Sequence, residues 1–168
     1  MNNNSQIYSD TFDSISVKEQ IEKSKIFIDT CSLMDDNFDR LIGNIGRWLI
    51  EYNQTLNIIN HVNYELQKNQ KSLDPLTSFK AARALNRIQM LEYLGLISKI
   101  RCYGKCSADS KFISQFTEIR THSPVLLITQ DNKLSQDIVS LNNLQSSYGY
   151  PVSVKRINAQ GYLGEFRY

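Results

Sequence analysis

The stretch KIFIDTCSLMDD, residues 25–36, carries the strongest indication of the fold of this chain. Ile26, Phe27 and Ile28 form a short run of β-branched and aromatic residues, which is typical of a buried strand. The run ends at a carboxylate, Asp29, and small residues follow it. Because sites in parallel α/β sheets form beyond the carboxyl ends of the strands, Asp29 is a candidate site residue.

Short apolar runs alternate with segments of helical periodicity along most of the chain. The expected strands are 25–29, 56–60, 100–103, 125–129 and 151–157, and residues 158–168 are expected to be a tail. The expected helices are 14–24, 38–54, 61–70, 75–94, 107–122 and 130–147. This alternation predicts an α/β protein, a three-layer α/β/α sandwich with a central, mainly parallel sheet of four or five strands. We expect an N-terminal extension, 1–24, partly disordered with one short helix, and a single domain, 25–168.

Composition indicates a cytoplasmic protein without a membrane span. The longest apolar run, 125–128, is far shorter than the roughly 18 residues that a transmembrane helix needs. The start, MNNNSQ, lacks the features of a signal peptide, and three cysteines do not suggest a disulfide framework. Residues 1–70 carry 6 basic and 10 acidic side chains, whereas residues 71–120 carry 9 basic and 4 acidic ones. This asymmetry suits a metal site beside a polyanion-binding surface, although solvated helices would explain it equally well.

Four acidic residues from separate segments are expected at one edge of the sheet. Asp29 and Asp131 each follow a strongly apolar strand. Glu65 lies beyond the second strand, and Asp109 opens the helix before the strand at 125–129. Grouped carboxylates repel one another unless a cation binds them, and such oxygen ligands suit Mg²⁺ or Mn²⁺.

Four motifs, FIDTCSLM, VNYEL, ADSKFISQF and LLITQDNKL, occur in the order and in the strand and helix context of PIN-domain nucleases. The chain resembles that family over residues 25–157. The resemblance implies a Mg²⁺- or Mn²⁺-dependent ribonuclease that hydrolyses phosphodiester bonds at an acidic site. It implies that Asp29, Asp109 and Asp131 hold metal directly or through water, and that Glu65 completes the site or positions the attacking water. Ser32 and Thr129 would support the acids by hydrogen bonds.

The chain departs from the family pattern at Lys133, where members often carry a further acid. One metal ion is therefore better supported than two, and Lys133 is a candidate phosphate contact. Lys80, Arg83 and Arg87 share one face of the expected helix 75–94 and are candidate RNA-binding residues. An ordinary solvated helix face is the alternative for these three residues.

The biological role is left open between a toxin neutralised by a protein antitoxin and an RNA-processing or defence nuclease. A homodimer is a further expected assembly. The non-enzymatic alternative is a catalytically degenerate PIN-like domain that binds nucleic acid or protein, and Lys133 is its best support. A D-x-D phosphatase and a D-x-S-x-S adhesion site are disfavoured because position 31 is Cys31.

Each candidate also has a structural interpretation. Asp29, Asp109 and Asp131 are all placed where a helix cap is expected, and Glu65 would suit a solvated surface. Asp35 and Asp36 are expected to be solvated residues before the next helix. Because acids oppose ionisation of a neighbouring thiol, Cys31 is not expected to be a nucleophile.

Overall fold

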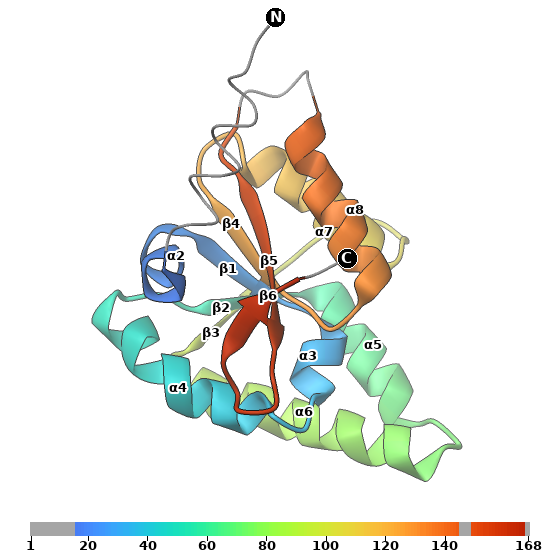
Figure 1. Cartoon of the computed structure of the whole chain (residues 1–168). Coiled ribbons are helices and arrows are strands. Elements are labelled where there is room, and N and C mark those ends of the chain that lie inside the picture. Colours follow the sequence, from blue (N-terminus) through green and yellow to red (C-terminus); the bar gives the residue numbers. More distant parts are fainter. Residues whose placement is uncertain (1–15, 145–148, 167–168) are drawn as a thin grey trace, which may run out of the picture.

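The computed structural model describes residues 16–144 and 149–166 of the 168-residue chain. Within these residues, six strands form one sheet with helices on both of its faces (Figure 1), which confirms the expected three-layer α/β/α sandwich. The strands are β1 (Lys25–Ile28), β2 (Leu56–Ile59), β3 (Ile97–Ile100), β4 (Val125–Ile128), β5 (Val152–Ile157) and β6 (Leu163–Glu165). The α-helices are α2 (Val17–Lys23), α3 (Thr30–Met34), α4 (Phe38–Glu51), α5 (Asn60–Gln70), α6 (Pro75–Tyr93), α7 (Ala108–Ile119) and α8 (Asn132–Ser140).

The sheet has the strand order β3-β2-β1-β4-β5-β6. The first five strands in this order run parallel, and β6 pairs antiparallel with β5. After β1, the chain builds β2 and β3 outward on one side and then crosses to β4 on the other side of β1. The strand order therefore reverses between β1 and β4, and this is where ligand sites form in open α/β sheets.

Both faces of the central strands are buried, as their continuous apolar runs predict. Phe27 of β1 packs edge-on against Phe116 of α7, with ring centroids 4.9 Å apart. On the other face, α4 contributes an apolar stripe: Phe38, Leu41, Ile45 and Leu49. Figure 1 shows α4 and α6 on one side of the sheet and α7 and α8 on the other.

Helix α6 begins and ends where its sequence predicts. Asp74 caps its first turn by accepting hydrogen bonds from the backbone N–H groups of Leu76 and Thr77, and Pro75 occupies the first helical position. The helix ends at Tyr93, two residues before Gly95, whose φ of 69° lies in the left-handed region that glycine adopts readily.

Two expectations about the strands were wrong, the bounds of β3 and the number of strands in the sheet. The strand expected at 100–103 is instead Ile97–Ile100, because β3 pairs with β2 from Leu56 to Ile59, and Ile100 is already opposite the last residue of β2. The expected tail contains β6, so the sheet has six strands rather than four or five. A turn with Gly161 at φ 80° folds β6 back onto β5.

The expected N-terminal helix is present from Val17 to Lys23, capped by the Ser16 hydroxyl, while residues 1–15 lie outside the described residues. Among the helices that the structure describes, none has both the length and the apolar character to cross a bilayer.

Candidate functional site

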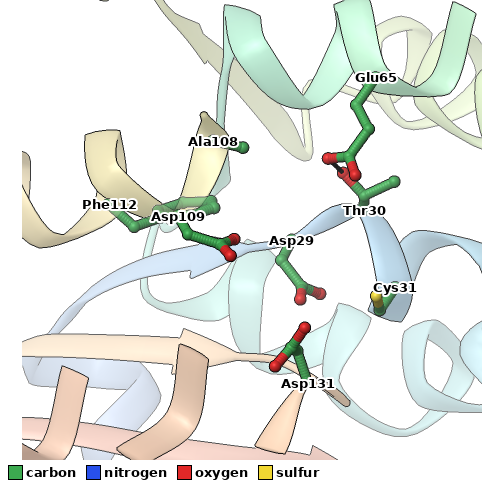
Figure 2. Close-up of a pocket in the computed structure, with 8 residues that line it drawn as sticks. All are labelled: Asp29, Thr30, Cys31, Glu65, Ala108, Asp109, Phe112 and Asp131. Atoms are coloured by element: carbon green, nitrogen blue, oxygen red, sulfur yellow. Dashed lines mark hydrogen bonds between the residues drawn. The ribbon is translucent and has the colours of Figure 1, made fainter. Parts of the chain in front are cut away.

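A cavity of about 80 Å³ lies beyond the carboxyl ends of β1 and β4. Its lining includes all four predicted acids together with two neighbours of Asp29: Asp29, Thr30, Cys31, Glu65, Asp109 and Asp131. Figure 2 shows the carboxylates of Asp29 and Asp131 directed toward each other and Asp109 approaching from α7. The predicted convergence of four acids from four segments is therefore present in the structure.

Asp29 is the most buried of the four acids, with 4% of its surface exposed. It directly follows β1 and caps α3, because its Oδ1 accepts a hydrogen bond of 2.8 Å from the backbone N–H of Ser32. Its Oδ2 accepts a hydrogen bond from the Thr129 hydroxyl. Burial raises the pKa of Asp29 to about 6, against the opposing effect of the hydrogen bonds from Thr129 and Ser32.

Asp131 directly precedes α8 and caps it, since its Oδ1 accepts a hydrogen bond of 2.9 Å from the Leu134 N–H. The backbone N–H of Asp131 donates to the Thr129 hydroxyl over 3.0 Å. Thr129 therefore joins the two acids, consistent with the supporting role expected for it. The helix-cap interpretation of Asp29 and Asp131 is also correct, because each carboxylate has one oxygen engaged in a cap.

Asp109 lies in the first turn of α7, and Ser107 is the cap of that helix. Partial desolvation, followed by the charges of Asp131 and Glu65, raises the pKa of Asp109, while the charge of Lys133 lowers it. Lys133 is exposed in the first turn of α8, and its positive charge favours the ionised form of Asp109.

Glu65 is an exposed residue of α5 and lines the cavity next to Thr30. The Thr30 hydroxyl donates a hydrogen bond of 2.6 Å to Oε2 of Glu65. Sequence reasoning did not single out Thr30. Its position directly after Asp29 was the available signal, but the approach of α5 to α3 is a tertiary contact that the sequence pattern does not display.

Ser32 and Cys31 are the two remaining residues of this segment, and Ser32 supports Asp29 through its backbone N–H rather than through its hydroxyl. The Ser32 hydroxyl donates to the backbone carbonyl of Ile128 over 3.1 Å and so joins α3 to the end of β4. For Cys31, desolvation and then the charges of the surrounding carboxylates raise the pKa of the thiol to about 12. This confirms that the acids disfavour the thiolate form that a nucleophile requires.

The donor set suits a hard divalent cation, because four carboxylates share one small cavity. Burial and then the neighbouring carboxylates raise the pKa values of Asp29 and Asp109, so a bound cation would offset the cost of their charged forms. Binding still requires side-chain movement. Among the described residues, no three His, Cys, Asp or Glu side chains are arranged so as to hold a metal ion. Asp29 and Asp131 are held by hydrogen bonds, whereas Asp109 and Glu65 are exposed, so movement of the two exposed side chains is what would bring the oxygens together.

Arg87 was predicted to bind RNA on an exposed face of α6, and this prediction was wrong because Arg87 is only 3% exposed. Its guanidinium forms two hydrogen bonds to Asp39, of 2.6 and 2.9 Å, and two to the backbone carbonyls of Leu33 and Asp35. Arg87 therefore holds the end of α3 against α6 rather than facing solvent.

Lys80 and Arg83 are partly exposed, and both form ion pairs with Asp36. Their predicted contact with RNA stays a prediction. Asp36 is exposed, as expected, but it is paired, and neither Asp35 nor Asp36 lines the acidic cavity. Asp35 instead accepts hydrogen bonds from the Asn37 N–H and the Gln130 side chain.

Comparison with protein-family models, curated proteins and solved structures found no match for this chain.

Proposed function

We propose that this protein is a ribonuclease that depends on a divalent metal ion, Mg²⁺ or Mn²⁺. The observation that carries the proposal is the convergence of Asp29, Glu65, Asp109 and Asp131 on one cavity at the point where the strand order reverses. The ordered resemblance of these motifs to PIN-domain nucleases supports phosphodiester hydrolysis as the reaction and RNA as the substrate.

The roles of the four acids follow from their surroundings. Asp29, fixed by Thr129 and Ser32, and Asp131, fixed by its cap on α8, are the preorganised ligands for the ion. Asp109 is exposed and can complete the ligand set from α7. A bound ion would polarise the scissile phosphate and lower the pKa of a water molecule.

Glu65 and Lys133 are assigned to the substrate side of the site. Glu65 is exposed and has a side-chain partner in Thr30, so it can orient the attacking water by a small rotation. Lys133 is exposed in the first turn of α8, and its charge lowers the pKa of Asp109, which supports a role for its ammonium group in balancing the charge of a phosphate.

The proposed biological setting is the cytoplasm, where all three cysteines would stay as the free thiols that the structure has. A toxin controlled by a protein antitoxin and an RNA-processing or defence nuclease are both compatible with this site. Pairing of the chain with a second copy belongs to the same proposal.

A second candidate is a degenerate domain that binds nucleic acid or protein without cleavage. Two observations favour it. Position 133 is a lysine where a further acid would strengthen metal binding, and no three of the described His, Cys, Asp or Glu side chains are arranged to hold a metal ion. Under this alternative, Asp29 and Asp131 serve only as helix caps.

A cleavage assay separates the two candidates. Purified protein is incubated with labelled RNA in Mn²⁺, Mg²⁺ or EDTA, and Asp29→Asn and Asp109→Asn are compared with Glu118→Gln. Glu118 is an exposed acid on α7, the same helix as Asp109, and it does not line the cavity. Cleavage by the wild type and Glu118→Gln that is lost in both Asn variants supports the ribonuclease. Cleavage that persists in Asp29→Asn, or is absent with both metal ions, would overturn it.

A further inference from the structure

A second, larger cavity of about 890 Å³ adjoins the acidic cavity. Its walls are the exposed side of α5 and the loop 101–107 between β3 and α7. It shares three residues with the acidic cavity: Glu65, Ala108 and Asp109. We call it the tyrosine groove, after Tyr64 and Tyr103 in its lining. A ligand lying in the tyrosine groove would therefore meet the proposed catalytic carboxylates at one end.

The tyrosine groove presents aromatic rings and ammonium groups to solvent. Tyr64 is 61% exposed and Tyr103 is 78% exposed, and His61 lies edge-on to Tyr64 with ring centroids 6.4 Å apart. Lys68 and Lys105 also line it and are exposed, and neither forms an ion pair with a residue that the structure describes. Exposed aromatic rings interleaved with lysines match the two surfaces of a nucleic-acid strand, the flat bases and the phosphates.

Hydrogen bonds hold the loop that carries Tyr103 and Lys105. The Asn60 side chain donates to the Cys102 carbonyl over 3.1 Å and accepts from the Cys102 N–H over 2.8 Å. The His61 ring is 3.1 Å from the Gly104 carbonyl. At Gly104, φ is 105°, so a residue with a side chain would be strained there. The groove is thus formed before any ligand arrives, which reduces the entropy lost on binding.

We propose that the tyrosine groove binds an unpaired nucleic-acid strand, with bases stacked on Tyr64 and Tyr103 and phosphates held by Lys68 and Lys105. This inference rests on the proposed ribonuclease function, because it names the form of the substrate and its path to the acidic cavity. In a duplex the bases are stacked on each other and their faces are covered, so a duplex cannot use the two rings. The groove therefore selects single strands.

Binding is tested in EDTA, where the metal-dependent reaction does not run. The probes are a labelled RNA of about 12 nucleotides without self-complementarity, a DNA of the same sequence, and the RNA annealed to its complement. The full-length wild type is compared with Tyr64→Ala, Tyr103→Ala and Tyr103→Phe. The matched control is Tyr93→Ala, which removes a 91% exposed tyrosine at the end of α6. Thermal unfolding verifies that each variant is folded.

We expect the wild type to bind single strands more tightly than the duplex, and each tyrosine-to-alanine change in the groove to weaken that binding about tenfold. Tyr103→Phe keeps the ring and should bind like the wild type, as should Tyr93→Ala. Replacing both Lys68 and Lys105 by Ala should reduce the magnitude of the slope of log K against log salt concentration by about 1.4. Equal binding of duplex and single strand, or wild-type affinity in Tyr64→Ala and Tyr103→Ala, would overturn the proposal.

A cleavage arm in Mn²⁺ keeps the two proposals separate. If Asp29-dependent cleavage is present but the groove variants bind and cut like the wild type, the proposal of strand binding in the tyrosine groove is refuted and the proposed ribonuclease function stands. If no cleavage occurs but binding in EDTA depends on the tyrosines, the groove stands and the ribonuclease fails. If both stand, Tyr103→Ala should raise KM while leaving kcat nearly unchanged.

Discussion

The Thr129 hydroxyl donates a hydrogen bond to the carboxylate of Asp29, 100 residues earlier in the chain. This contact exists because β1 and β4 are parallel neighbours in register from Lys25 with Val125 to Ile28 with Ile128. The same hydroxyl oxygen accepts a hydrogen bond from the Asp131 N–H. One buried oxygen therefore fixes the relative positions of two proposed metal ligands.

Thr129→Val should raise the pKa of Asp29 further above its present value of about 6, because it removes a hydrogen bond that favours the carboxylate. We expect a rise of about one unit, since a hydrogen bond to a charged group contributes about 1.5–3 kcal/mol and part of this is recovered by relaxation. A titration of the Asp29 carboxyl by NMR measures it. Thr129→Ser is the control and should leave the pKa in place; an unchanged pKa in Thr129→Val would show that the hydroxyl does not act on Asp29.

Asp29→Asn should change the dependence of stability on pH in metal-free protein. Asp29 has a folded pKa of about 6, above the ordinary value of 3.8, so between these values the folded chain holds a proton that the unfolded chain has released. The contribution of Asp29 to stability is therefore present at low pH and is lost as pH rises through 6, and the loss amounts to about 3 kcal/mol. Urea unfolding in EDTA should show Asp29→Asn gaining stability relative to the wild type between about pH 4 and 6. A difference that stays constant over this range contradicts the prediction.

Addition of Mn²⁺ should raise the Tm of the wild type, and EDTA should reverse the effect. At an ion concentration ten times Kd the expected stabilisation is about 1.4 kcal/mol. The shift should be larger at neutral pH than near pH 5, because protons compete with the ion at Asp29, whose pKa is raised to about 6. Differential scanning calorimetry measures the shift, with Glu118→Gln behaving like the wild type and Asp131→Asn losing most of the effect.

Arg87→Ala should destabilise the fold by about 2–3 kcal/mol, because the carbonyls of Leu33 and Asp35 lose buried donors. The midpoint of urea unfolding measures this loss. Arg83→Ala is the matched control, since Arg83 is a partly exposed neighbour on α6 with an ion pair to Asp36, and its loss should be below about 1 kcal/mol. Equal losses in the two variants would contradict the structural role of Arg87.

The local elements were readable because apolar periodicity and capping residues act over a few positions. The runs that became β1 and β4 end in Asp29 and Asp131, and the sequence alone identified both acids and the helices that they precede. Pro75 and Gly95 marked the two ends of α6 for the same reason. The short strand β6 was missed because its three residues, between a turn and the end of the chain, carry too little periodicity.

The helix periodicity of α6 was also readable, but it did not reveal what each face contacts. Lys80, Arg83 and Arg87 share a face, yet that face packs toward α3 and the linker after it, so Arg87 is buried and the other two are paired. A pattern of charges cannot distinguish solvent from a polar partner supplied by a distant segment.

Local sequence patterns were enough to predict the fold class, the order of strands and helices along most of the chain, and the four acids together with the Thr129 hydroxyl that joins two of them. The adjacency of β1 and β4, the hydrogen bond from Thr30 to Glu65 and the opening of the tyrosine groove onto the acidic cavity became visible only in the packed molecule. This division arises because periodicity indicates which side of an element is buried, whereas the neighbours of that side depend on how all the elements pack together.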